Sequence, residues 1–229
     1  MKITYLSHST ILLEINNIKI IVDPFLSKNN LFNKQLLNKY INSKIDYMLI
    51  THAHYDHICD VELFSKNNPD MLIISNYEIS NYFNKKNISS CGINYGSFIT
   101  FPFGKIKYTF ALHSSSFNDG SYGGNPGGFL LHTNEGNIYI SGDTSITYEM
   151  KFIPKFGDLN LSVLPIGGVY TMDVYDSIIA SDLLKCDQIL GVHYDTFENI
   201  KINKEKSIKE FYNKEKKLIL LNCEESIII

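Results

Sequence analysis

Residues 45–57, IDYMLITHAHYDH, join a short apolar run directly to a cluster of ionisable side chains. A near-continuous apolar run of this length is typical of a strand that is buried on both faces of a sheet. The cluster follows without a linker and contains His52, His54, Asp56 and His57. A chain that ends a buried strand in this way is expected to fold as an α/β protein, because such proteins place their sites at the carboxyl ends of strands.

Apolar periodicity and turn residues predict further strands and helices along the whole chain. The expected strands are 2–6, 10–15, 18–22, 45–50, 71–75, 105–111, 128–133, 137–141, 161–165, 188–193 and 217–221. The expected helices are 76–86, which a capping box at 75–78 would open, 174–185 and 205–215. Hairpins mixed with alternating strands and helices predict one α/β domain over residues 1–229, with mixed sheets.

The composition excludes several classes of protein. The net charge is −3, and all 21 basic residues are lysine. Because arginine is the preferred residue for gripping phosphate and reading bases, we expect no nucleic-acid partner. No apolar run approaches the ~18 residues of a membrane span, and the first residues resemble a strand rather than a signal peptide. The four scattered cysteines favour reduced thiols and a cytoplasmic protein.

The spacing of the histidines in the cluster suits metal ions. Residues two apart at the end of a strand point to the same side, so His52 and His54 can converge on one ion. Asp56 and His57 lie just beyond, where the chain turns, and can face a second ion. Two ions need roughly four to six ligands each, some of them water, so other residues must contribute.

Three residues in the second half of the chain match this requirement. His113, Asp143 and His193 each lie at the end of a predicted strand. The carboxyl ends of strands gather at one edge of an α/β sheet, so we expect these side chains to join the first cluster. For each residue taken alone, a structural role would be the alternative interpretation.

The ordered set of motifs resembles the metallo-β-lactamase superfamily, in which H-x-H-x-D-H precedes separate His, Asp and His residues. More narrowly, it resembles the UPF0173 metal-dependent hydrolase group, which is related to the ascorbate-6-phosphate lactonases. The matching segments are YLSHSTILLEI, IVDPFL, LITHAHYDH, ALHSSS, DGSYGGNPGGF, ISGDT, LPIGGVYTM and GVHYDTF. The resemblance implies a four-layer αββα sandwich of two mixed sheets and two similar halves, with the site at one edge between the sheets.

The resemblance also implies a role for each candidate ligand. One ion would be held by His52, His54 and His113, the second by Asp56, His57 and His193, and Asp143 would bridge the two. Asp23 would orient the cluster loop by hydrogen bonds, as ligating histidines usually require. The cofactors would be two divalent ions, zinc first, with manganese or iron as alternatives.

Further residues are candidates for the substrate pocket: His8, Tyr55, Asn125, Tyr170, Thr171 and Tyr194. For His8, a buried structural histidine is an equal alternative. We expect the glycine-rich segment 123–128 to form a rim of the site, His132 to lie on the surface, and Asp60 to cap the helix that follows it.

These features predict a binuclear metal-dependent hydrolase. A metal-bridging hydroxide would attack a small, anionic ester, lactone or phosphodiester, with an ester or lactone favoured, and Asp56 would act in catalysis by relaying a proton to the leaving group. The alternatives are a nuclease, a diiron oxidoreductase and a non-catalytic metal-binding protein. We expect a small-molecule substrate and no membrane partner; nothing in the sequence marks an interface for a homo-oligomer.

Overall fold

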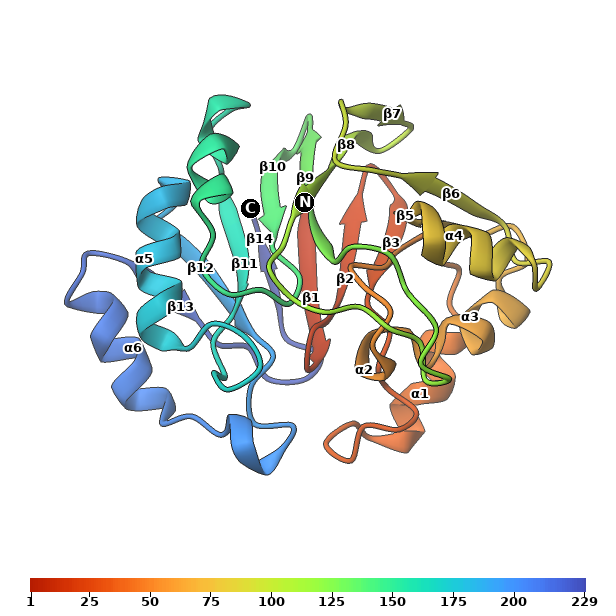
Figure 1. Ribbon diagram of the computed structural model, residues 1–229. Helices are drawn as coiled ribbons and strands as arrows, with labels where there is room; N and C mark the ends of the chain where they lie inside the picture. Colours follow the sequence, from red (N-terminus) through yellow and green to blue (C-terminus); the bar gives the residue numbers. More distant parts are fainter.

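The computed structural model describes residues 1–229 as two seven-stranded sheets packed face to face, with helices on their outer faces (Figure 1). The first sheet has the order β14-β1-β2-β3-β4-β5-β6. Its strands are β1 (Lys2–Ser7), β2 (Thr10–Ile15), β3 (Ile18–Val22), β4 (Tyr47–Leu49), β5 (Leu72–Asn76), β6 (Ser90–Ile93) and β14 (Ser226–Ile228). The sandwich confirms the predicted fold class.

The second sheet has the order β13-β12-β11-β10-β9-β8-β7. Its strands are β7 (Ile99–Phe101), β8 (Gly104–Phe110), β9 (Gly127–Thr133), β10 (Gly136–Ile140), β11 (Leu161–Pro165), β12 (Gln188–Val192) and β13 (Lys217–Ile219). In each sheet, three antiparallel pairings are followed by three parallel ones, so both sheets are mixed and the two halves resemble each other. The last strand, β14, returns to the first sheet and occupies the place that β7 has in the second.

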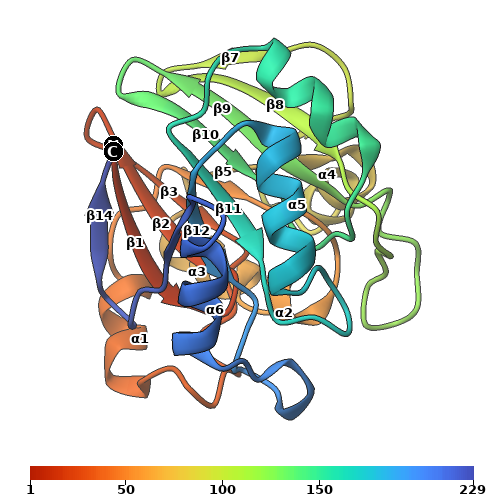
Figure 2. The same cartoon turned by 90° about the vertical axis from the view of Figure 1, so that its left-hand side faces the viewer.

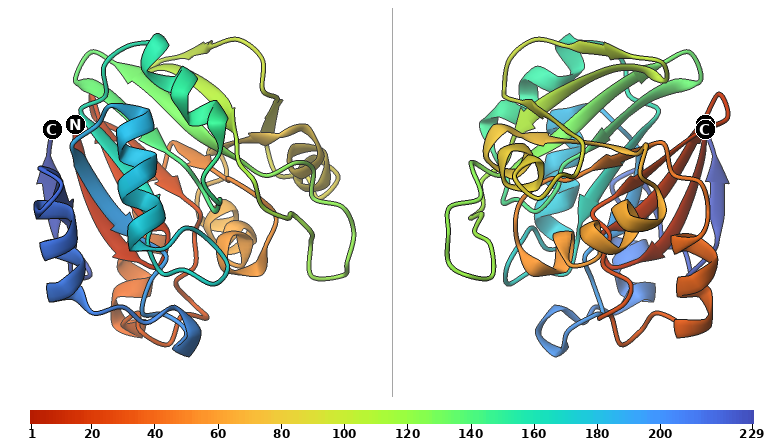
Figure 3. Two further views of the ribbon diagram at one scale, coloured as in Figure 1. Left: turned by 60° about the vertical axis from the view of Figure 1, so that its left-hand side comes forward. Right: turned by 90° about the vertical axis from the view of Figure 1, so that its right-hand side faces the viewer.

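Helices cover the outer face of each sheet. They are α1 (Lys34–Ile41), α2 (Tyr55–Ile58), α3 (Val61–Asn67), α4 (Tyr77–Asn84), α5 (Val174–Leu184) and α6 (Lys204–Tyr212), with 3-10 helices η1 (Tyr148–Lys155) and η2 (Glu198–Ile200). Figure 2 looks onto α5 and α6 over the second sheet, and the right-hand view of Figure 3 looks onto the helices of the first. No helix has the length and apolar character that crossing a membrane requires.

The core consists of three apolar layers, which follow from the period of two along the strands. In β2, Ile11, Leu13 and Ile15 face the second sheet and belong to the central layer of 22 buried residues. Leu12 points the other way and packs in the layer under α1, α3 and α4. A third layer lies between the second sheet and α5, α6 and η1. The layers leave the strand ends free to carry polar side chains at one edge.

Each strand and helix predicted from the sequence is present, and the observed ends lie within three residues of the predicted ones. The sequence did not predict α1, α2, η1, η2, β6, β7 or β14, and it predicted α3 only as the helix that follows Asp60, without bounds. Strands β7 and β14 have three residues each, too few for alternation to be recognised, and the neighbouring strands hold them in place.

Helix α4 begins near the predicted residue, but the capping box predicted at 75–78 is wrong. Strand β5 continues to Asn76, so Asn76 is the residue that caps α4, and its side chain accepts a hydrogen bond from the backbone N–H of Ile79 at 2.8 Å. The Ser75 hydroxyl instead donates to the carbonyl of Ile50 at 2.8 Å, which ties β5 to the end of β4.

The predicted helix cap at Asp60 is also wrong. Asp60 precedes α3, but its side chain makes no capping bond. Its buried carboxylate accepts from the backbone N–H of Leu26 at 2.6 Å and from the backbone N–H of Ser27 at 2.9 Å, and also from the Ser27 hydroxyl. Asp60 therefore stabilises the loop after β3, which lies beside the histidine cluster.

Replacing Asp60 by Ala is expected to lower the free energy of unfolding by about 3 kcal/mol, because it leaves buried N–H groups of this loop without an acceptor. Urea denaturation measures the loss. The matched control is Asp70→Ala at an exposed aspartate, which should change stability by no more than about 0.5 kcal/mol. Equal stability of the two variants would contradict the role assigned to Asp60.

Candidate metal centre

All seven predicted ligands meet at one edge between the two sheets, near α2 at the bottom of Figure 1. They come from five segments: the loop after β4 (His52, His54), α2 (Asp56, His57), and the residues that follow β8 (His113), β10 (Asp143) and β12 (His193). Nitrogen and carboxylate oxygen atoms of these residues form groups in which all members lie within 4.8 Å of one another. The structure therefore brings together residues as far apart in the chain as 52 and 193.

His52, His54 and His113 form the first of these groups. The Nε2 atom of His52 lies 3.0 Å from Nδ1 of His54. The ring centroid of His113 lies 5.0 Å from each of the other two rings. His52 is fully buried, whereas His54 and His113 are partly exposed, so solvent reaches the cluster from the side of His54 and His113.

The carboxylate of Asp143 occupies the centre of the cluster. Its Oδ2 atom lies 2.9 Å from Nε2 of His193, 3.3 Å from Nε2 of His57, 3.7 Å from Nε2 of His113 and 3.9 Å from Nε2 of His52. The side chain is buried, and its Oδ1 atom has no hydrogen-bond partner. One carboxylate therefore touches both groups of histidines.

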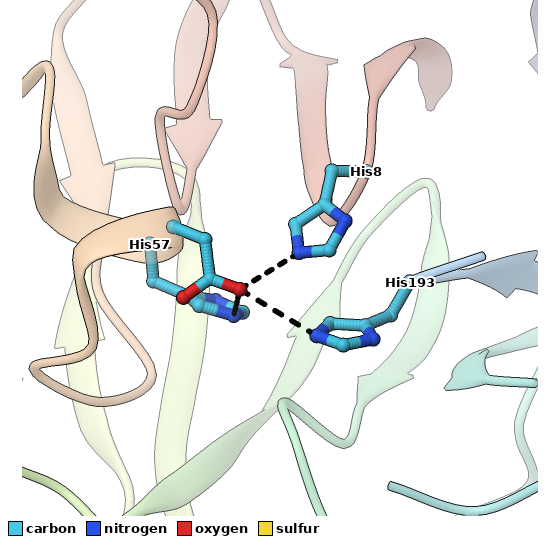
Figure 4. A group of neighbouring side chains, drawn as sticks. His8, His57 and His193 are labelled. Carbon is cyan, nitrogen blue, oxygen red and sulfur yellow. Dashed lines mark hydrogen bonds and ion pairs between the residues drawn. The ribbon is translucent and has the colours of Figure 1, made fainter. Parts of the chain in front are cut away.

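Asp56 forms the centre of a second group with His8, His57 and His193, and Figure 4 shows the three imidazoles around its carboxylate. The Oδ2 atom of Asp56 lies 3.0 Å from Nε2 of His8, 3.7 Å from Nε2 of His193 and 3.8 Å from Nε2 of His57. His8 is fully buried and hydrogen-bonded, as the structural alternative expected, and its contact with substrate stays a prediction.

Hydrogen bonds behind the cluster fix which nitrogen of His57 and His52 faces it. His57 directs Nδ1 at the Asp23 carboxylate, 2.8 Å away, so this nitrogen carries a hydrogen and Nε2 is the nitrogen that faces the cluster. The Thr51 hydroxyl donates to Asp23 at 2.7 Å, so it can only accept from Nδ1 of His52 at 3.0 Å. Nε2 of His52 therefore points inward without a hydrogen.

The charges of the cluster perturb the pKa values of its members. Burial alone would raise the pKa of Asp143, but His193 and His57 hold it well below its usual range. Burial alone would lower the pKa of His193, but Asp143 and Asp56 raise it to about 9. Burial also lowers the pKa of His57, and Asp143, Asp23 and Asp56 more than offset this and hold it well above its usual range. The carboxylates therefore favour positive charge at the centre.

The outer histidines differ, because burial and the neighbouring imidazoles outweigh the carboxylates. Burial, followed by the charge of His57, holds the pKa of His52 well below its usual range and lowers that of His54. Burial likewise lowers the pKa of His113. For His8, burial and the charge of His193 lower the pKa to about 4. These rings are neutral at neutral pH, as ligands to a metal ion must be.

The residues present fit divalent cations. The buried atoms Nε2 of His57 and Oδ1 of Asp143 lack hydrogen-bond partners, although buried polar groups are almost always paired. Imidazole nitrogen and carboxylate oxygen are the donors that such cations accept, and the negative potential at the centre favours them.

Three of the residues predicted to line the substrate pocket, Tyr55, Asn125 and Tyr170, are exposed. Tyr55, at the start of α2, lines a groove of about 590 Å³ together with residues of α3, α4 and the loop at Phe117. The Tyr170 hydroxyl accepts a hydrogen bond from the Asn199 amide at 3.2 Å. Asn125 accepts from the Tyr122 hydroxyl at 2.8 Å through its side chain. Their contact with substrate stays a prediction.

Other expectations are corrected by burial. Tyr194 belongs to the apolar layer under α5 and α6, so it does not line a pocket. Thr171 is buried in the loop after β11, where its hydroxyl donates to the carbonyl of Met172 at 3.3 Å, so it does not line a pocket either. His132 is half-buried rather than on the surface, with its ring centroid 4.8 Å from that of Phe98.

The glycine-rich segment supports the cluster loop instead of forming an open rim. A Cβ atom at Gly123 would lie 2.3 Å from Cβ of Ala53, so only glycine fits there. The hydroxyl of Ser115 accepts from the backbone N–H of Ala53 at 3.1 Å and donates to the carbonyl of Gly123 at 3.0 Å. Gly127 and Gly128 belong to β9.

Some residues that support the ligands were not predicted from the sequence. Thr51 immediately precedes His52 and orients both Asp23 and His52, and its position before the histidine motif was a usable signal. The ring of Phe197 packs edge-on against His8, with ring centroids 5.5 Å apart, and no pattern in the sequence indicated this contact.

The chain is similar to known proteins over most of its length. Residues 2–193 match the family model described as the beta-lactamase superfamily domain. A UPF0173 metal-dependent hydrolase of Flavobacterium johnsoniae is 52% identical over 228 residues, and one of Christiangramia forsetii is 48% identical over 228 residues; each alignment covers 99% of both chains.

A solved structure, that of the metallo hydrolase Igni18 from the archaeon Ignicoccus hospitalis, superposes with a TM-score of 0.89 at 29% identity. The superposition covers 100% of this chain and 97% of the other. The chain therefore belongs to the β-lactamase superfamily and, within it, to the UPF0173 group of metal-dependent hydrolases.

Proposed function

We propose that the protein is a binuclear metal-dependent hydrolase of a small ester, lactone or phosphodiester. The observation that carries the proposal is the position of Asp143, whose Oδ2 atom has four imidazole nitrogens within 3.9 Å. Two of these nitrogens belong to the proposed ligand set of His52, His54 and His113, and two belong to the proposed set of Asp56, His57 and His193. A shared carboxylate between two such sets is suited to a pair of ions.

Divalent ions in these positions would lower the pKa of a bound water and polarise a substrate oxygen. The residues of the chain hold and orient the donors for this chemistry. Asp23 and Thr51 occupy Nδ1 of His57 and His52, so that Nε2 of each ring is the nitrogen available to an ion. The imidazole and carboxylate donors suit zinc, and they also suit manganese or iron.

Substrate would approach from the side of the cluster where His54, His113 and Asp56 are partly exposed. None of the ion pairs within the cluster includes a lysine, and the chain has no arginine. The anionic substrate expected from the sequence therefore has no lysine or arginine to pair with among these residues. We accordingly favour an ester or lactone, whose carbonyl is uncharged, over a phosphodiester.

Asp56 is the residue placed to move a proton during the reaction. Burial would raise the pKa of its carboxyl, but His57, His193 and His8 hold the pKa well below its usual range. Asp56 is thus ionised at neutral pH, and it is the partly exposed carboxylate of the cluster. It can accept a proton from the attacking water and pass it to the leaving group.

The ligand scheme predicts that zinc-loaded protein carries two Zn²⁺ per chain and that Asp143→Ala carries fewer. Hydrolysis of p-nitrophenyl esters, lactones and bis-p-nitrophenyl phosphate should fall by more than ~100-fold in this variant, since even indirect partners of ligands are worth ~10–100-fold in affinity or activity. Elemental analysis and initial rates measure the two effects. His132→Gln, at the end of β9 away from the cluster, is the matched control and should keep both ions.

Wild-type metal content in the Asp143→Ala variant would show that the scheme is wrong. Two bound ions without hydrolysis of any member of the panel would favour a non-catalytic metal-binding protein. Faster turnover of the phosphodiester than of any ester or lactone would reverse the preference for carbonyl substrates.

The proton-transfer role of Asp56 predicts a dependence on the leaving group. In Asp56→Asn, alkyl esters should lose on the order of 100-fold more activity than p-nitrophenyl esters, because an alkoxide needs a proton to leave and p-nitrophenolate does not. The comparison of the two rates within one metal-loaded sample cancels differences in occupancy. Equal losses of activity for both esters would contradict the proton-transfer role and would leave Asp56 only as a residue that holds metal.

A further inference from the structure

We propose that His8 is a positioning residue, which holds the Asp56 carboxylate in the orientation that the second ion requires. The inference rests on the proposed binuclear site. His8 lies in the turn between β1 and β2, more than forty residues before the histidine motif, and although it lies in the group around Asp56, it is not one of the seven predicted ligands.

The contacts of His8 use both ring nitrogens. Nε2 lies 3.0 Å from Oδ2 of Asp56, and Nδ1 lies 2.9 Å from the hydroxyl oxygen of Thr196. The imidazole is fully buried, and Figure 4 shows it above the carboxylate, on the side away from His57. A buried ring with partners at both ends has one orientation available, so it can fix the group that it contacts.

Asp56 has no other hydrogen-bond donor in the protein. Helix α2 has only four residues, and no backbone N–H bonds to this carboxylate. His193 and His57 lie 3.7 and 3.8 Å from Oδ2, beyond the reach of a hydrogen bond. Without His8, rotation about the side-chain bonds of Asp56 would be restrained only by packing and by the ion itself.

The direction of the hydrogen bonds follows from the carboxylate. Oδ2 of Asp56 can only accept, so Nε2 of His8 must carry the hydrogen at this distance. In the neutral ring, Nδ1 then accepts from the Thr196 hydroxyl. The Asp56 carboxylate therefore sets the tautomer of His8, and the Thr196 hydroxyl, which also lies 3.3 Å from the carbonyl oxygen of Tyr194, holds the other side of the ring.

The backbone of His8 is anchored as firmly as its ring. Its carbonyl accepts a hydrogen bond from the backbone N–H of His193 at 3.0 Å. The φ angle of His8 is +56°, and that of His193 is +55°, a conformation that residues other than glycine seldom adopt. Strained backbone of this kind persists where the surrounding structure determines it, and it is common at functional sites. His8 thus joins Asp56 and His193, two ligands of the same ion.

The proposal is tested by titrating Zn²⁺ into metal-free protein and following the heat of binding to each site. The variants are His8→Gln, whose amide nitrogen can take the place of Nε2, and His8→Asn, whose shorter amide reaches Thr196 but not Asp56. His8→Ala removes both contacts, and His132→Gln controls for the loss of an unrelated histidine. Far-UV circular dichroism establishes that each variant is folded.

We expect wild type, His8→Gln and the His132→Gln control to bind two Zn²⁺. In His8→Asn and His8→Ala, the first ion should bind with unchanged affinity, and the dissociation constant of the second should rise by about 10–100-fold. The comparison of Gln with Asn keeps the test decisive if the Ala variant fails to fold, since both amides are close to histidine in size.

Two results would overturn the inference while leaving the binuclear site intact. If wild type binds two ions and His8→Asn binds the second as tightly, the hydrogen bond to Asp56 does not matter. If His8→Gln loses the second ion as completely as His8→Ala, His8 is itself a ligand rather than a positioning residue. Binding of a single ion by wild type would instead overturn the proposed function, and the inference with it.

Discussion

The buried carboxylate of Asp23 joins the end of β3 to the beginning of the histidine loop. It accepts from the Thr51 backbone N–H at 2.8 Å and from the Thr51 hydroxyl at 2.7 Å, and it faces Nδ1 of His57 at 2.8 Å. The backbone N–H of Asp23 donates to the carbonyl of Leu49. Because the carboxylate is almost completely buried, each of these donors is needed to offset its desolvation. The orientation of the whole cluster depends on this interaction, although Asp23 lies outside the ligand sets.

The two halves of the fold are equally necessary, because each contributes part of the site. The first sheet and its loops present His52, His54, Asp56 and His57, and the strands of the second sheet present the rest. The central apolar layer between the sheets sets the distance between these two contributions. Cores are close-packed and yield little, so ligand positions at the edge inherit the rigidity of the layer. Adding or removing one methylene in the central layer would therefore shift the strand ends that carry the candidate ligands.

The sequence predicted most of the architecture and the set of residues that meet in the cluster, because both have strong local signals. Strands such as β2 alternate clearly, and the motif around His52 concentrates donors within a few residues. Other features had no local signal. The contact between His8 and Asp56 depends on the packing of the β1–β2 turn against α2, and the burial of Tyr194 depends on α6. Asp60 was misassigned because its position before a helix favours a cap, whereas the loop at Ser27 offered it better donors.

The uneven burial of the cluster has a kinetic meaning. His57, His193 and Asp143 are sealed from solvent, whereas His54 and His113 lie at the open face. An ion held by His52, His54 and His113 would have two partly exposed ligands, whereas one held by Asp56, His57 and His193 would have only Asp56 partly exposed, so water and competing chelators would reach the first ion more easily. The two positions should therefore exchange their ions with the surrounding solution at different rates even if their affinities are equal. The protein would then retain one ion as a lasting part of its structure and take the other from whatever metal pool surrounds it.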